Sequence, residues 1–246
     1  MGYHESLTEG RNAVLEAFRS GKTVDRLFVL DGCQDGPVKT ILREAKKQDT
    51  MVQYVKKERL DQLSETKNHQ GVIAYCAACE YAEVSDILEN AKKKGEAPFI
   101  VLLDGIEDPH NLGAIIRTAN QAGAHGVIIP KRRAVGLTAT VARTSAGAVN
   151  YTPVAKVTNL VTVMEDLKKE GMWFVCADMD GEEMYSLNVK GPIGLVIGNE
   201  GEGVSRLVKE HCDMVASIPM KGDIDSLNAS VAMGVLAYEI VRQRRF

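Results

Sequence analysis

Long apolar runs are missing from this 246-residue chain. No stretch approaches the roughly 18 consecutive apolar residues that a membrane-spanning helix requires. The residues from Met1 to Ser6 also lack the basic region and the following apolar stretch of a secretory signal. The sequence therefore predicts a cytoplasmic protein that has no contact with a membrane.

Cysteine is scarce as well. Five cysteines in an odd, scattered set are typical of reduced thiols and do not indicate a disulfide framework. Cys76-Ala-Ala-Cys79 has the spacing of a redox or metal pair, but no second pair or histidine cluster completes a zinc site. The apolar residues before Cys76 instead favour the end of a buried strand, and we predict no metal site.

The chain has no strong excess of either charge. Its net charge is −3, with 12 basic and 11 acidic residues in 1–76 and with 15 and 17 in 98–246. The general positive field that attracts a polyanion is therefore absent. A nucleic-acid partner would have to meet a local basic patch.

The composition that remains is that of an ordinary globular protein, with 45% hydrophobic and 26% charged residues. The first part alternates helix and strand patterns, which predict a small α/β unit. Its predicted helices cover 9–19, 38–47 and 58–64, and its predicted strands cover 26–30, 51–55 and 71–76. A polar helix over 84–95 is either a linker or the first element of the next domain. We predict a domain over 1–76, a linker over 77–97 and a second domain over 98–246.

The second part has strands of a different kind. Continuous apolar runs occur at 99–103, 126–129, 173–177, 194–197 and 214–218, with helical patterns between them. Such runs are typical of a parallel sheet that helices cover on both faces. Ligands bind beyond the carboxyl ends of the strands in an open sheet of this kind. The strand-to-helix turns are therefore the places to look for chemistry.

The first such turn covers residues 103–119. Asn111 is a candidate N-cap for a helix that runs to about Ala122 and is closed by Gly123. Arg117 follows six residues later, so the two side chains project from adjacent turns of this helix. The alternative for Arg117 is a surface salt bridge to an acidic residue at 107 or 108.

The second turn, residues 197–205, has three glycines in six residues at the end of a strand. Glycines there permit positive φ and close backbone approach to a ligand. The spacing is neither the dinucleotide GxGxxG nor a phosphate-binding loop. Glu200 and Glu202 would repel a phosphate, so a ligand without phosphate that offers donors fits better. The alternative is a tight turn without a ligand.

The third turn, residues 218–230, leads into a long apolar helix that runs from near Asn228 to about Arg242. Ser226 and Asn228 are natural capping residues, which is the alternative to a functional role for both. The small and apolar residues of this helix favour a core position or a helix–helix interface.

Together, in this order and spacing, the three turns resemble those of the SPOUT methyltransferases, and more narrowly the TrmH/RlmB branch of RNA ribose 2′-O-methyltransferases. The N-terminal unit, with Asn68-His69-Gln70-Gly71 near its end, is similar to the small RNA-binding domain of the RlmB-like members, which looks like a ribosomal-protein fold. The resemblance implies an α/β fold with a deep trefoil knot in the C-terminal domain. It also implies a homodimer through the knots and the final helix, with S-adenosylmethionine as cofactor.

The resemblance also implies roles for individual residues. Those that match the polar positions of the active site are Asn111, Arg117, Glu200, Ser226 and Asn228. Those that would hold the cofactor are Gly198, Asn199, Gly201, Ile218, Met220 and Leu227. The resemblance implies that Arg117 accepts the proton of the ribose hydroxyl, but an arginine stays protonated in proteins. We therefore prefer that Arg117 stabilises a developing alkoxide and a neighbouring phosphate.

RNA contact needs positive charge near this pocket. The candidates are Lys131, Arg132, Arg133 and Arg143 in the C-terminal part and Arg11 and His69 in the N-terminal part. The expected function is 2′-O-methylation of a ribose in RNA, most specifically a guanosine of 23S rRNA. The alternatives are a tRNA ribose 2′-O-methyltransferase and a non-catalytic RNA-binding factor of ribosome assembly.

Overall fold

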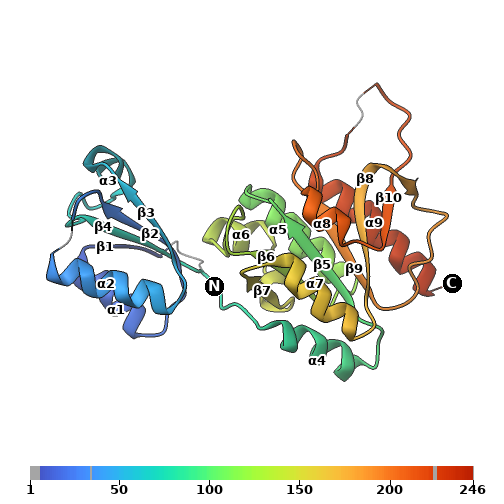
Figure 1. Cartoon of the computed structure of the whole chain (residues 1–246), viewed down its shortest axis with the longest axis horizontal. Coiled ribbons are helices and arrows are strands. Elements are labelled where there is room, and N and C mark those ends of the chain that lie inside the picture. Colours follow the sequence, from blue (N-terminus) through green and yellow to red (C-terminus); the bar gives the residue numbers. More distant parts are fainter. Residues whose placement is uncertain (1–5, 34, 224–225, 246) are drawn as a thin grey trace. The chain divides into compact units, whose positions relative to one another are not determined.

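The structure is a computed structural model that describes residues 6–33, 35–223 and 226–245 (Figure 1). The chain divides into two compact units, each with its own sheet and core. One unit ends at Glu80 and also takes in Gly136–Ala139, and the other begins at Tyr81.

The N-terminal unit is a small α/β domain, as predicted. Its sheet has the order β1-β4-β2-β3, in which β2 and β3 are parallel and the other pairs antiparallel. Helices α1 and α2 pack on one face, and α3 packs against the other with Leu60. The elements are β1 (Ser6–Glu9), α1 (Arg11–Arg19), β2 (Val24–Leu30), α2 (Gly36–Lys47), β3 (Met51–Val55), α3 (Lys57–Leu63) and β4 (Val72–Cys76).

Strand β1 is an element that the sequence pattern did not predict. A helix was expected to begin at Glu9, but Glu9 is the last residue of the strand. Gly10 follows with a φ of 87°, a conformation that glycine adopts without steric cost. The backbone therefore turns at Gly10, and the helix begins only at Arg11.

The C-terminal unit contains a six-stranded sheet of order β10-β8-β9-β5-β6-β7, and every pair of neighbours is parallel. The predicted parallel sheet is confirmed. Its elements are α4 (Val84–Lys94), β5 (Phe99–Asp104), α5 (Pro109–Gln121), β6 (Gly126–Pro130), α6 (Ala139–Thr144), the 3-10 turn η1 (Ala148–Asn150), β7 (Val154–Val157), α7 (Leu160–Lys169), β8 (Trp173–Glu183), β9 (Ile193–Gly198), α8 (Arg206–Glu210), β10 (Met214–Ser217) and α9 (Ala229–Arg245).

Two strands differ from the prediction because their residues do not form a clear apolar pattern. Strand β7 has only four residues and was missed. Strand β8 continues from Ala177 to Glu183, although this half is polar and mostly exposed. A bulge in the pairing with β10 accommodates the extension, and Gly181 lies so close to the Val215 carbonyl that a Cβ would collide with it.

Helices cover both faces of the large sheet. Helices α4, α7 and α8 bury Ile87, Met164 and Val208 against one face. Helix α9 lies on the other face and packs beside α5, where a Cβ on Gly234 would stand 3.5 Å from Thr118. None of the helices in the described ranges is long and apolar enough to cross a membrane.

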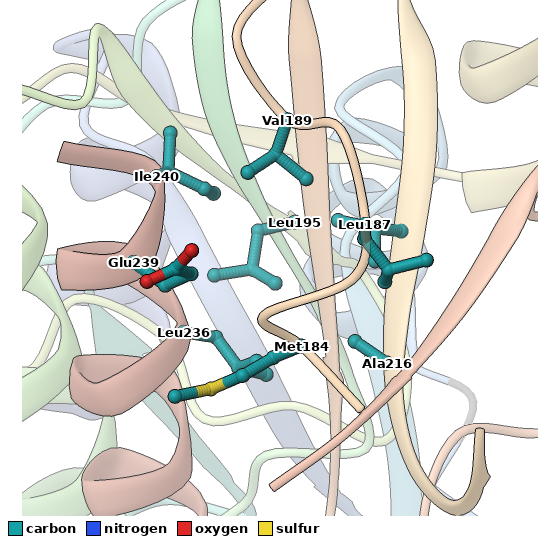
Figure 2. Close-up of a pocket in the computed structure, with 9 residues that line it drawn as sticks. Met184, Leu187, Val189, Leu195, Ala216, Leu236, Glu239 and Ile240 are labelled. Atoms are coloured by element: carbon teal, nitrogen blue, oxygen red, sulfur yellow. The ribbon is translucent and has the colours of Figure 1, made fainter. Parts of the chain in front are cut away.

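A small cavity remains between α9 and the sheet (Figure 2). Its only charged lining residue is Glu239, whose carboxylate accepts hydrogen bonds from Arg242 at 2.7 and 2.8 Å and from Gln243 at 2.7 Å. Since this carboxylate already has its partners, the cavity is a packing gap. The apolar lining consists of Val175, Met184, Leu187, Val189, Leu195, Ala216, Leu236 and Ile240.

His125 is a fully buried polar residue at the amino end of β6. Its Nδ1 accepts the Phe99 amide hydrogen at 3.0 Å, so its proton lies on Nε2, which faces Glu96 Oε2 at 3.1 Å. Protonation of Nδ1 would set two donors against each other. Burial, which disfavours the charged imidazolium, is the main cause that lowers the pKa of His125 below its ordinary value of 6.5.

We expect this histidine to make the fold acid-sensitive. A group whose pKa is lower in the folded state stabilises the fold above its unfolded pKa, and this contribution is lost as the pH falls. The free energy of unfolding should therefore decrease as the pH is lowered from 6.5 towards the depressed pKa. Urea unfolding over this range should show a weaker pH dependence for His125→Asn than for wild type and for His211→Asn, a partly exposed control. Identical pH dependence in all three would contradict this assignment.

Candidate active site

Three side chains from the three predicted turns form one hydrogen-bonded cluster. The Asn111 side-chain amide donates to Glu200 Oε1. The Asn228 side-chain amide donates to Asn111 Oδ1 at 2.9 Å and to Glu200 Oε1 at 3.1 Å. These residues are 28 to 117 positions apart in the chain, so only the fold brings them together. The cluster lies where the turns after β5 and β9 meet the start of α9.

The prediction that Asn111 is an N-cap is wrong. Helix α5 begins two residues earlier, at Pro109, and its N-cap is Asp108, whose carboxylate accepts the His110 amide hydrogen at 2.9 Å. Proline suits the first helical position because its missing N–H would have no partner there. Asn111 is therefore an inner residue of the first turn, 8% exposed, and its side chain is free of capping.

Asn228 combines both of the roles that its sequence position allowed. It immediately precedes α9, and its Oδ1 accepts the Ser230 amide hydrogen at 3.0 Å, which is a capping contact. Its Nδ2 points to the cluster instead. The cap thus fixes the orientation of the amide group that bonds Asn111 and Glu200.

The glycine loop after β9 is held by its own backbone. A Cβ on Gly198 would collide with the carbonyl group of Gly203, and Gly203 has a φ of 68°. The Gly203 amide donates to the Asn199 carbonyl at 3.0 Å. Asn199 Oδ1 accepts the amide hydrogens of Gly201 at 2.9 Å and Glu202 at 2.7 Å. Because these two N–H groups are engaged, the loop does not present them to a phosphate.

The third segment supplies apolar surface. Ile218 and Leu227 are partly buried, and Met220 is 39% exposed. Ser226 is exposed and has no hydrogen bond to the cluster within the part of the chain that the structure describes. Residues 224 and 225 lie outside the described residues.

Arg117 has no hydrogen bond to the cluster among the described residues. It is exposed on α5, six residues or about one and two-thirds turns beyond Asn111. Within residues 6–33, 35–223 and 226–245 it has no ion pair, so the alternative of a salt bridge to Glu107 or Asp108 is not formed. Its guanidinium group faces solvent.

The basic candidates of the C-terminal unit lie near the carboxyl end of β6. Arg132 and Arg133 are exposed in the turn that follows this strand, and Lys131 is partly exposed. Arg143 is exposed on α6, where it donates to Thr140 Oγ1 at 3.4 Å. The turn therefore offers positive charge to the surface.

The two candidates of the N-terminal unit are engaged in the fold. Arg11 pairs with Asp35 at 2.6 Å and donates to the Gln70 carbonyl at 3.0 Å. His69 is 7% exposed, with Nε2 3.0 Å from Asp61 and Nδ1 accepting the Gly71 amide hydrogen. His69 thus shapes the turn at 69–71, while Arg11 remains partly exposed beside it.

No metal centre is present among the described residues, where no group of three or more potential ligands comes together. Cys76 is the buried last residue of β4, as predicted, and burial raises the pKa of the neighbouring thiol of Cys79.

One polar residue near the site was not predicted. The carboxylate of Asp104, at the end of β5, accepts the Ser205 amide hydrogen at 2.8 Å. An aspartate at the carboxyl end of an apolar strand was a visible signal, but its partner lies 101 residues away in the sequence.

Comparisons with known proteins agree with this arrangement. A family model described as the SpoU rRNA Methylase family matches residues 98–238, and one described as RNA 2′-O ribose methyltransferase substrate binding matches residues 7–82. YacO of Bacillus subtilis (strain 168), by name a TrmH family tRNA/rRNA methyltransferase, is 49% identical over 237 residues, which cover 96% of this chain and 94% of YacO.

Two solved structures are also similar. The AdoMet-bound rRNA methyltransferase from Sinorhizobium meliloti is 25% identical, with a TM-score of 0.60 over 96% of this chain and 86% of that one. The A. aeolicus TrmH/SpoU tRNA modifying enzyme is 28% identical, with a TM-score of 0.56 over 65% of this chain and 84% of that one.

The two family models and these relatives show that the chain is an S-adenosylmethionine-dependent RNA 2′-O-methyltransferase, and the parallel sheet with its polar cluster at the carboxyl edge agrees with this class. The chain belongs to the SpoU rRNA methylase family, in its TrmH-related group.

The close approach at Gly198 gives a testable consequence. In Gly198→Ala the new methyl group meets backbone that cannot move aside, so the free energy of unfolding should fall by about 1–3 kcal/mol. Gly201→Ala is the matched control, because its Cβ would be 3.6 Å from Asn199 Oδ1, an ordinary contact. Thermal unfolding of both variants measures the difference, and equal loss of stability in the two would refute the crowding argument.

Proposed function

We propose that the protein transfers a methyl group to the 2′-hydroxyl of a guanosine in 23S rRNA. The observation that carries the proposal is the cluster of Asn111, Glu200 and Asn228 beside the glycine loop. A ribosomal substrate is supported by the share of this chain that each solved neighbour matches. The S. meliloti rRNA methyltransferase matches 96% of this chain, whereas the tRNA modifying enzyme matches 65%. The difference is about the length of the substrate-binding domain over residues 7–82.

The loop suits S-adenosylmethionine, which has no phosphate. The residues that would hold it are Gly198, Asn199, Gly201, Ile218, Met220 and Leu227. The amides of Gly201 and Glu202 already donate hydrogen bonds within the loop, so they need no bound anion. The partly buried Ile218 and Leu227 offer apolar surface to an adenine ring. The neighbouring carboxylate of Glu200 favours a cation such as a sulfonium. When bound, this cofactor supplies an electrophilic methyl group.

The chain's own residues then position and polarise the ribose hydroxyl. Arg117, which stays protonated, stabilises the developing alkoxide and the neighbouring phosphate as the proton leaves to water. Glu200 orients Asn111 and Asn228, with which it shares hydrogen bonds, and these amides with Ser226 fix the ribose. S-adenosylmethionine held by the glycine loop would supply its methyl group to the ribose oxygen that these residues position.

In the C-terminal domain, RNA phosphates would be contacted by the basic turn 131–133 and by Arg143. In the N-terminal domain, RNA would be contacted by Arg11, which lies beside the turn that His69 shapes.

The proposal includes a cytoplasmic location, a deep trefoil knot in the C-terminal domain and a homodimer that uses α9. Two apolar side chains on this helix, Val231 at 50% and Tyr238 at 51% exposure, support such an interface.

A tRNA ribose is the second candidate substrate, because YacO is named for both RNA classes and the A. aeolicus neighbour modifies tRNA. A non-catalytic assembly factor is disfavoured, since RNA binding alone does not require three buried or bonded polar side chains at the cofactor loop.

The deciding experiment incubates the protein with radiolabelled S-adenosylmethionine and, separately, unmodified 23S rRNA and bulk tRNA. Label at one 23S guanosine supports the proposal, and label only in tRNA replaces the substrate. Failure to bind S-adenosylhomocysteine in calorimetry would overturn the methyltransferase assignment.

In the radiolabel methylation assay Arg117→Ala should lower kcat by about 100- to 1000-fold, the usual cost of losing an oxyanion donor. Arg206→Ala, which removes an exposed arginine of α8, is the control and should retain full activity.

RNA affinity should depend on the basic turn. Replacing Lys131, Arg132 and Arg133 together by alanine should reduce the slope of log affinity against log salt by about two to three, because each phosphate contact contributes about one. The control variant replaces Lys92, Lys93 and Lys94 at the end of α4 and removes the same charge. Filter binding at several salt concentrations compares them, and equal slopes would remove the turn from the RNA interface.

A further inference from the structure

The loop that carries Glu200 lies against Asp104 at both of its ends. At its start, Gly198 is the last residue of β9 and stands opposite Asp104, the last residue of β5, in the parallel ladder. At its end, the Ser205 amide donates to Asp104 Oδ2 at 2.8 Å. One residue of β5 therefore marks where the loop leaves the sheet and where it returns.

A second side chain organises the middle of the loop. Asn199 Oδ1 accepts two amide hydrogens, from Gly201 and Glu202, and this forms an Asx turn around Glu200. The turn after β5 lies close to the same side chain, because a Cβ on Gly105 would stand 3.0 Å from Asn199 Nδ2. The side-chain oxygen of Asn199 is thus committed to the loop.

These contacts matter because little else holds Glu200. The residue is exposed, and its carboxylate bonds only to the side chains of Asn111 and Asn228 among the described residues. The loop around it contains glycines, which carry the largest conformational freedom of any residue. The hydrogen bond from the Ser205 amide to Asp104 adds a tie from outside the loop to the contacts that the loop makes within itself.

We propose that Asp104 and Asn199 are positioning residues that fix the Glu200 carboxylate against Asn111 and Asn228. This inference rests on the proposed methyl transfer. Asp104 acts through a charge-assisted hydrogen bond to the Ser205 amide, which is stronger than a neutral one. Asn199 acts through the Asx turn that its side-chain oxygen forms, in addition to the cofactor contact proposed for it above.

The experiment is a double-mutant cycle between Asp104 and Glu200. Asp104→Ala should lower kcat by about 10- to 100-fold, the scale expected when a catalytic group is displaced by about an ångström. Asp104→Asn keeps an acceptor oxygen for the Ser205 amide and should stay within about threefold of wild type. In a Glu200→Ala background, Asp104→Ala should cost less than about twofold more, because residues that act as a unit are not additive. Fully additive losses would overturn the proposal.

A matched control separates positioning from general stability. Asp86 also accepts a backbone hydrogen, from the Glu83 amide at 2.9 Å, but at the start of α4. Asp86→Ala should lower the melting temperature, but its kcat should equal that of wild type when measured well below that temperature. A kcat loss in Asp86→Ala equal to that in Asp104→Ala would show that the effect is one of stability alone. Asn199→Ala serves as the second variant should Asp104→Ala not fold, and it should show the same non-additivity with Glu200→Ala.

Amide hydrogen exchange keeps the inference independent of turnover. Asp104→Ala should speed exchange in the peptide that covers 199–205, and Asp86→Ala should not. If wild type methylates no RNA, the proposed function fails, while this exchange result still decides whether Asp104 fixes the loop. Unchanged exchange in Asp104→Ala would overturn the positioning role in either case.

Discussion

The parallel pairing of β5 with β9 is the constraint on which the site depends. In this ladder Asp104 stands opposite Gly198, so the turns that follow both strands leave the sheet at the same edge. The first turn leads to Asn111, and the second carries Glu200. The strands are almost one hundred residues apart in sequence but adjacent in the sheet. Helix α9 then returns beside α5 and brings Asn228 to the same point.

The polar groups around this edge are satisfied mainly by one another. Asp104 and Asn199 bond loop amides, and Asn228 uses one side-chain atom to cap α9 and another to bond the cluster. Arg117 is the exception, since it is exposed and forms no ion pair among the described residues. A guanidinium group that is not already paired can bind an anion without first breaking a salt bridge.

Local sequence rules located most elements but misjudged several ends. Apolar runs identified five strands of the parallel sheet, and the signal was strongest for β5, β6 and β9, whose residues are almost all buried. Strand β7 and the polar half of β8 escaped because short or exposed strands leave little pattern. Asn111 was misplaced as a cap because Asp108, followed by proline, is an earlier and better capping site.

The sequence by itself determined the class of sheet, the family that the chain resembles and the three strand-to-helix turns in which we expected the site. Periodicity, glycine spacing and capping preferences are local properties, so they can be read from neighbouring residues. Only the tertiary structure decided that Asn111, Glu200 and Asn228 bond one another, that Asp104 clasps the glycine loop and that His69 is buried. Such contacts join residues far apart in the chain, and strand order and helix packing, which no local pattern encodes, set which of them meet.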